Sequence, residues 1–161
     1  MLFSEAAKRR VLSTKTAQSV GVLAGFVVDP TAARIAALRV KKSEGPGDIL
    51  GWEDLTAFGQ DVITVASAEA IADPHGRVAD LLARPGELLG KRILTDAGNE
   101  IGTVTDVDFD PAEGKVLSLL TTAGRLAGDR LVGCGSYAVV VREQRSSGTG
   151  EGARQDSDRT G

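Results

Sequence analysis

Two stretches of the chain, VGVLAGFVVDP at residues 20–30 and IGTVTDVDFDP at residues 101–111, repeat one pattern 81 positions apart. Both are rich in β-branched residues, which is typical of a β-strand. Each ends in Asp-Pro, and proline at that position favours a turn. An apolar segment follows each turn, at residues 34–42 and 115–122, so each stretch predicts one arm of a β-hairpin.

The repeat extends beyond the hairpin in both directions. Leu12 aligns with Ile93 at the same offset, whereas Leu55 aligns with Leu131 at an offset of 76, which makes the second copy five residues shorter. Further short strands are expected at residues 10–13, 61–66, 92–95 and 137–141, with a helical turn within residues 52–58. Two copies are fewer than a solenoid needs, so two small domains or two halves of one body are the better interpretation.

Short strands joined by glycine turns favour a small β-barrel, because closure removes exposed strand edges. The alternation of apolar residues breaks near Gly102–Thr105, which predicts a β-bulge or a sharp bend there and at Gly21–Ala24 in the first copy. The expected fold class is all-β, with two small β-barrels in tandem, short helical linker segments and a disordered C-terminal tail.

The expected domain boundaries follow from the repeat: copy one at 1–66, a linker at 67–85, copy two at 86–143 and a disordered tail at 144–161. A barrel of about 60 residues is only marginally stable alone. Apolar residues remain outside the predicted strands, in or beside the linker, at Ile71, Val78, Leu81, Leu82 and Leu88. We therefore expect the two barrels to pack side by side with pseudo-twofold symmetry, and the linker to cover part of their junction.

Composition excludes several classes of chemistry. The 161 residues carry 19 Lys and Arg against 22 Asp and Glu, a net charge of −3, so the whole protein is not an electrostatic nucleic-acid binder. One cysteine, Cys134, and one histidine, His75, exclude an internal disulfide and a multi-ligand Cys or His metal site. Cys134 aligns with Phe58, which favours a small core residue, and His75 lies in a turn. No apolar run approaches the ~18 residues that cross a membrane, so we expect no membrane insertion and a cytoplasmic location.

The second copy resembles the PRC-barrel family. Residues 89–107, LGKRILTDAGNEIGTVTDV, look like the family's opening: Leu-Gly-Lys, an apolar strand, an acidic glycine turn, then Ile-Gly-x-Val. The first copy resembles it more loosely. Residues 51–55, GWEDL, are similar to the family's Pro-Trp-x-Asp-Ile step with Gly51 in place of proline, but residues 10–15 lack the Gly-Lys and the acidic turn.

The resemblance implies a small β-barrel that serves as an adaptor. Family members include the cytoplasmic domain of the photosynthetic reaction-centre H subunit, the C-terminal domain of the small-subunit ribosome maturation factor, and stand-alone bacterial and archaeal proteins. The family shares no catalytic residues, so none is carried over to this chain, and no cofactor or metal is expected. The leading hypothesis is a non-enzymatic adaptor that binds a protein partner, and a homo-oligomer is left open.

Four residues are candidates for an interaction surface. Trp52 is the single tryptophan, and two roles are open for it: a half-buried anchor or an interface hot spot. Arg39, Lys41 and Lys42 form the densest basic cluster, and strand alternation places Arg39 and Lys41 on one face with Lys42 at the loop entry. Such a patch could bind a phosphate of RNA or lipid, or simply be a solvated edge. An RNA-associated or ribosome-associated maturation factor is therefore the alternative hypothesis.

Three aspartates, Asp106, Asp108 and Asp110, alternate along the second hairpin strand. Hard-cation ligands could be spaced in this way, and Asp106 with Asp108 could form an acid/base pair, which gives a weaker third hypothesis of a small hydrolase. Of the three, only Asp110 has an acidic counterpart in copy one, Asp29. Both of these precede proline, so turn capping is the favoured interpretation.

Overall fold

The computed structural model describes residues 1–83 and 87–143, and most of this part of the chain is β-structure. The predicted disorder of residues 144–161 lies outside the described residues. The strands of the first sheet are β1 (Arg10–Ser13), β2 (Ser19–Asp29), β3 (Arg34–Lys41), β4 (Ile49–Gly51), β5 (Leu55–Phe58), β6 (Ile63–Val65) and β7 (Ile71–Ala72). Those of the second are β8 (Arg92–Thr95), β9 (Glu100–Phe109), β10 (Val116–Thr121), β11 (Gly124–Ala127), β12 (Leu131–Cys134) and β13 (Val139–Val141).

The helical segments of the described residues are short. They are α1 (Phe3–Ala6), α2 (Gly76–Leu82) and the 3-10 turns η1 (Trp52–Asp54), η2 (Ala68–Ala70) and η3 (Gly128–Arg130). The helical turn predicted within residues 52–58 covers only η1, because Leu55 and the residues after it pair with β6 as strand β5. In the part of the chain that the structure describes, no helix combines the length and apolar character of a membrane span.

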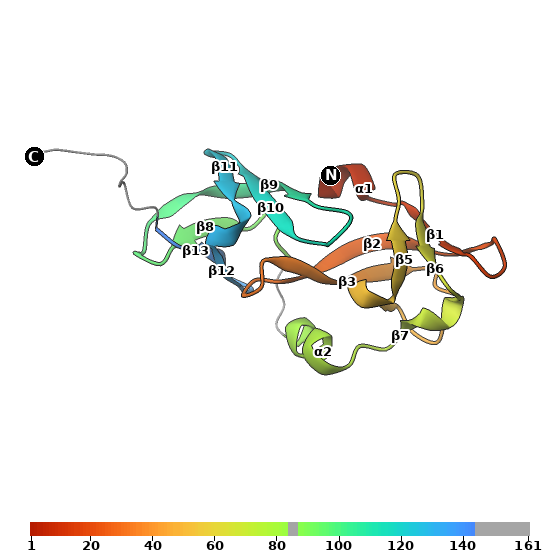
Figure 1. Cartoon of the computed structure of the whole chain (residues 1–161). Helices are drawn as coiled ribbons and strands as arrows, with labels where there is room; N and C mark the ends of the chain where they lie inside the picture. Colours follow the sequence, from red (N-terminus) through yellow and green to blue (C-terminus); the bar gives the residue numbers. More distant parts are fainter. Residues whose placement is uncertain (84–86, 144–161) are drawn as a thin grey trace, which may run out of the picture.

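The six strands of the second sheet follow the same order as six of the seven strands of the first, and β7 has no counterpart. The first runs β5-β6-β1-β2-β3-β4-β7 and the second, read in the same direction, β12-β13-β8-β9-β10-β11. In both, the opening strand pairs antiparallel with the long hairpin strand and parallel with the last strand, as β1 does with β2 and β6. Each sheet curls into a half-barrel-like unit (Figure 1). The all-β fold with two small barrels in tandem is therefore confirmed.

Bulges occur at matching positions in the two long strands. Opposite β3, the register of β2 skips Ala24 between Leu23 and Gly25, and opposite β10, the register of β9 skips Thr105. These bulged residues stand 81 positions apart and lie within the segments where bulges were predicted. A bulge bends the strand that contains it, so the same device curls both sheets.

The two hairpins meet at a pseudo-twofold axis. The Ile35 N–H donates to the Gly114 carbonyl over 2.7 Å, and the Val116 N–H donates to the Ala33 carbonyl over 2.8 Å. Val116 is the counterpart of Ile35 and Gly114 that of Ala33, so one bond is the symmetry image of the other. The predicted side-by-side packing with pseudo-twofold symmetry is therefore confirmed.

One hydrophobic core spans both sheets. Its centre is Phe109 of β9, which is fully buried and lies 5.3–5.6 Å, between ring centroids, from three aromatic rings of copy one. Those rings belong to Phe3, Phe26 and Phe58. The short helix α1 carries Phe3 and lies between the second hairpin and the first sheet (Figure 1). The copies thus share aromatic packing that neither has alone.

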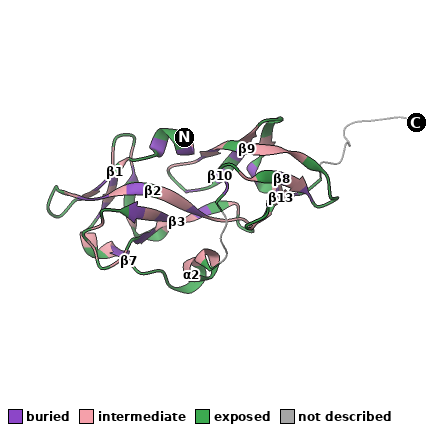
Figure 2. Ribbon diagram, turned by 180° about the vertical axis from the view of Figure 1, so that it is seen from behind, coloured by how far each residue is buried: buried purple, intermediate pink, exposed green. Residues whose placement is uncertain are grey.

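Two of the apolar residues in or beside the linker, Ile71 of β7 and Leu88, are buried in the shared core. The other three belong to α2, which packs on the outer face of the first sheet. The prediction that the linker covers part of the junction is therefore wrong for α2. The contact joins Val78, Leu81 and Leu82 of the helix to Val27, Ala37 and Ile49 of the strands. Figure 2 shows α2 with half-buried and exposed residues only, as expected for a helix lying on a surface.

Candidate interaction surface

The outer side of β3 carries the basic cluster. Leu38 and Val40 are buried in the shared core, so the alternating positions Arg39 and Lys41 lie on the opposite, outer face. Lys42 follows directly after the strand, with a φ of 54°, and begins the loop to β4. The placement of these three residues within the strand and loop is therefore as the alternation predicted.

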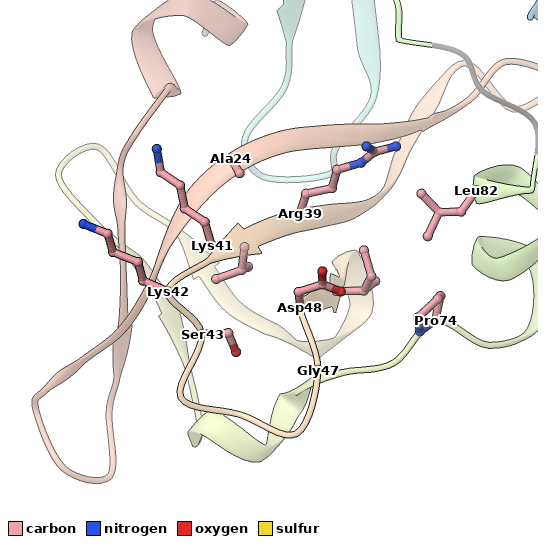
Figure 3. A pocket seen from close by; sticks show the side chains of 11 residues that line it. Ala24, Arg39, Lys41, Lys42, Ser43, Gly47, Asp48, Pro74 and Leu82 are labelled. Atoms are coloured by element: carbon pink, nitrogen blue, oxygen red, sulfur yellow. The ribbon is translucent and has the colours of Figure 1, made fainter. Parts of the chain in front are cut away.

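These side chains border an open hollow of about 630 Å³ between β3 and α2. Figure 3 shows Lys41 and Lys42 at one end of it and Leu82 with Pro74 at the other, while Asp48 lies between the two ends. Ile49 is part of the lining, and Arg39 extends along the hollow from the middle of β3. The hollow thus has a cationic end and an apolar end.

A second hollow adjoins the first and shares Lys41 and Lys42 with it. It adds Lys8 and Arg10, which the sequence did not single out as interaction residues. Arg10 pairs with Val22 and Val22 pairs with Lys41, so these positions form one row across β1, β2 and β3. Arg10 and Lys41 are 31 positions apart in the sequence. Their proximity could have been predicted only from the pairing of the first strand with the predicted hairpin. We call Lys8, Arg10, Arg39, Lys41 and Lys42 the basic surface.

The cations of the basic surface form no direct ion pair among the described residues. Nor does any of the five side chains form a hydrogen bond among these residues, and the Arg39 Nε is shielded from solvent without a partner. Two carboxylates, Glu44 and Asp48, line the same hollows. A third carboxylate, Glu87, lies beside Arg39, because its Oε1 and the Arg39 Cδ are 3.6 and 3.7 Å from the same point above Gly25. Five cations against three carboxylates leave an excess of positive charge, which attracts anionic groups in spite of the negative charge of the whole chain.

Trp52 lies apart from the basic surface and lines neither of its hollows. Its ring covers Gly114 of the other copy so closely that a Cβ there would come within 2.7 Å of the indole. It also stacks beside Phe58, with 5.7 Å between ring centroids. The indole thus contacts both copies at their junction, and its remaining exposed edge lines a groove with Arg34 and Lys115.

The carboxylates of Asp106 and Asp108 are engaged by the N-terminal segment. Asp106 accepts hydrogen bonds from the backbone N–H and hydroxyl of Ser4. Asp108 accepts from the Met1 amino group over 2.9 Å and from Arg125 over 3.4 Å. The Met1 amino group, and secondly Arg125, hold the pKa of Asp108 below its usual value. These contacts fix the N-terminal segment to β9 and engage both carboxylates on which the hydrolase hypothesis rests.

The two aspartates that precede proline cap their turns, as the sequence predicted. Asp29 accepts from the Thr31 N–H over 3.1 Å, and Asp110 accepts from the Ala112 N–H over 2.9 Å. Asp29 also pairs with Arg77 of α2 over 3.0 Å, and hydrogen bonding to Arg77 lowers the pKa of Asp29. This ion pair helps hold α2 on the first sheet.

The single cysteine and the single histidine lie where the sequence predicted them. Cys134 is half-buried against the core, and burial raises the pKa of its thiol, which disfavours the reactive thiolate. His75 is exposed just before α2. Across residues 1–83 and 87–143, no three His, Cys, Asp or Glu side chains gather where a metal ion could be held.

Comparison with known proteins assigns the second copy. Residues 83–146 match the family model of the PRC-barrel domain, so this part of the chain is a PRC-barrel domain, as the sequence motif indicated. The domain is a kind of protein-interaction module, and its family is generally non-catalytic. No curated protein matches the chain. The first copy lies outside the match but has the same strand order as the second.

Proposed function

We propose that the protein is a non-enzymatic, cytoplasmic adaptor that binds a protein partner through the basic surface. The supporting observation is that five cations lie on one outer face of the first sheet with no intramolecular partner among the described residues. The PRC-barrel domain, packed against the first copy, supplies a rigid support for that face. Trp52 serves in this proposal as an anchor of the junction rather than as a partner contact.

The RNA alternative is less well supported by the same face. Proteins that bind single-stranded RNA commonly stack bases on aromatic side chains. The basic surface offers none, because no aromatic residue lines either hollow. Four of the six aromatic rings meet in the core and Trp52 lies at the junction, while Tyr137 is on the second copy. Glu44 and Asp48 would also repel a closely charged phosphate backbone.

The proposal can be tested by capture of partners from a cell lysate with the full chain as bait, with and without nuclease. Three baits are compared: the unchanged protein, Lys41→Glu, and Lys15→Glu as a control. Lys15 is exposed on the loop between β1 and β2 and lines neither hollow. We expect a protein that resists nuclease treatment, that the first and third baits retain, and that Lys41→Glu loses. The captured protein, once purified, should show the same dependence in a direct titration.

Two results would contradict the proposal. If nuclease abolishes capture of every partner, the surface acts on RNA, and the maturation-factor alternative takes its place. If Lys41→Glu retains all that the unchanged protein retains, the basic surface is not where the partner binds.

A further inference from the structure

The two hollows join at Lys41 and Lys42, so the basic surface is one continuous path with an apolar end beside α2. We infer that this path binds an acidic, extended segment of a protein partner that carries one apolar side chain at the end facing α2. The inference rests on the proposed function and specifies the chemistry of the partner.

The cationic part of the path has the spacing of an extended peptide. Arg39 and Lys41 are two positions apart on one face of β3, which separates their Cα atoms by roughly 7 Å. Carboxylates at alternate positions of an extended segment have the same separation. A segment lying parallel to β3 can therefore place successive carboxylates opposite Arg39 and Lys41. Arg10, in the row that runs from Lys41 across β2, offers a further cation at the far end.

The apolar end can bury an uncharged side chain. Leu82 is the last residue of α2 and is half-buried, Ile49 is largely buried on β4, and Pro74 is exposed. An apolar side chain placed among them would cover surface that water now contacts, which is favourable in proportion to the area covered. A leucine-sized side chain fits this requirement, because it is apolar and reaches past the backbone into the hollow.

Asp48 lies between the two ends of the hollow, and its carboxylate disfavours a ligand that is negatively charged along its whole length. A phosphate backbone has a negative charge at each unit and would bring one next to Asp48, which is unfavourable. A peptide avoids the repulsion when its residue nearest Asp48 is neutral and its acidic residues lie over Arg39 and Lys41 of β3. An anionic lipid surface is flat and does not follow the hollow. The pattern of charge thus selects a peptide with a defined order: apolar, neutral, then acidic.

The experiment is a fluorescence anisotropy titration of the full chain against a labelled synthetic peptide. The peptide contains one leucine, one glycine and then four glutamates alternating with serine, and a matched peptide has alanine in place of the leucine. We expect the leucine peptide to bind and its affinity to fall as salt is added. Lys41→Glu should weaken binding roughly tenfold or more, and Lys15→Glu no more than about twofold.

The apolar end is tested with Leu82→Ala. We expect this variant to weaken binding of the leucine peptide by roughly fivefold and to leave the alanine peptide nearly unchanged, since the two changes remove the same contact. Thermal unfolding of the variant shows whether α2 remains folded on the sheet. The lysine variants test the cationic end independently, because their side chains are exposed and form no ion pair among the described residues.

Three results would overturn the inference. They are equal binding to the Lys41→Glu and Lys15→Glu variants, equal binding of the leucine and alanine peptides to the unchanged protein, and tighter binding of an oligouridine RNA or of phosphatidylserine vesicles than of the peptide. If the peptide fails while a captured protein still depends on Lys41, this inference falls and the proposed function stands. If neither depends on Lys41, both fall.

Discussion

The outer faces of the two sheets are formed by corresponding strands, but their side chains are apolar on the first sheet and polar on the second. On the first sheet, Val27, Ala37 and Ile49 form an apolar triad under α2. Their counterparts on the second sheet are Asp108, Ser118 and Arg125, a polar triad in which Arg125 donates to the Ser118 hydroxyl over 2.7 Å and to Asp108 over 3.4 Å. The pairing of Val27 with Ala37 recurs as that of Asp108 with Ser118, so the positions are equivalent.

The difference shows that the repeat preserves the backbone while the exposed side chains diverge. Covering an apolar triad removes apolar surface from water, which is favourable. The linker helix α2, which follows the first copy, covers this triad. A helix placed on the polar triad would have to bury charged groups, which is costly, and the Met1 amino group contacts Asp108 there instead. The hollow between a helix and a basic strand therefore lies on the first sheet.

The largest effect on the free energy of unfolding is expected in the shared core, where the two copies are packed together and cannot be compared separately. Phe109→Ala should lower the free energy of unfolding by about 3–5 kcal/mol, because a fully buried ring is removed from contact with three others. Trp52 belongs to the first copy and its indole also lies on Gly114 of the second, whereas circular dichroism reports on both sheets. The Trp52 fluorescence and the circular dichroism signal should shift to lower urea together. A Trp52 transition that keeps its midpoint would show that the copies unfold independently.

The next largest effect is expected when the residues at two equivalent positions of the outer faces are exchanged. Val27→Asp places an unpaired carboxylate under α2 and should cost about 2–4 kcal/mol in urea unfolding. The reverse change, Asp108→Val, loses ion pairs at a partly exposed position and should cost less than about 1.5 kcal/mol. Equal costs for the two variants would mean that the two faces are not energetically distinct.

Sequence reasoning found the longest features that the repeat carries twice. The hairpins, the 81-residue offset and the bulges at Ala24 and Thr105 follow from apolar alternation and from its interruption. It did not find the short strands β4, β5, β7, β11 and β12, which have two to four residues each. Strands this short have little measurable period, and β7 exists because Leu50 of β4 offers a partner to Ile71.

Only the part of the candidate site that lies on one predicted strand was found from the sequence. Arg39, Lys41 and Lys42 are neighbours in sequence, and alternation alone places them. Lys8 and Arg10 join them only through the pairing of β1 with β2 and of β2 with β3. The apolar end was missed because it depends on where α2 packs, and several apolar surfaces could have received that helix.

A smaller effect is expected where the two copies meet at residues with a positive φ. Gly114 has a φ of +78° and lies under the Trp52 ring, so Gly114→Ala should cost about 2 kcal/mol through backbone strain and the close contact. Its counterpart Ala33 has a φ of 51°, and Ala33→Gly should stabilise the protein by about 0.5 kcal/mol. Urea unfolding of the two variants should give changes of opposite sign, and changes of the same sign would contradict the assigned backbone geometry.

The smallest effect concerns the ion pair that holds α2. Asp29→Asn keeps the turn bond to Thr31 and removes the charge facing Arg77, so it should cost up to about 1 kcal/mol at pH 7. The pKa of Asp29 is lower in the folded than in the unfolded chain, so this contribution is complete above the unfolded value, about 3.9, and is lost as the pH falls through the folded value. The difference between the two proteins should therefore vanish in acid. Asp110→Asn is the control, because Asp110 has the same turn bond and no ion pair among the described residues.

The central claim, that the first copy carries the partner-binding face and the second does not, is tested most directly by nuclear magnetic resonance. The leucine-containing acidic peptide is titrated into isotope-labelled full-length protein, and the backbone amide shifts are followed. The account predicts that the shifts that change are those around Arg39, Lys41, Lys42 and Leu82, with those around Asp108, Ser118 and Arg125 unchanged. Changes centred on the polar triad, or spread equally over both sheets, would contradict it.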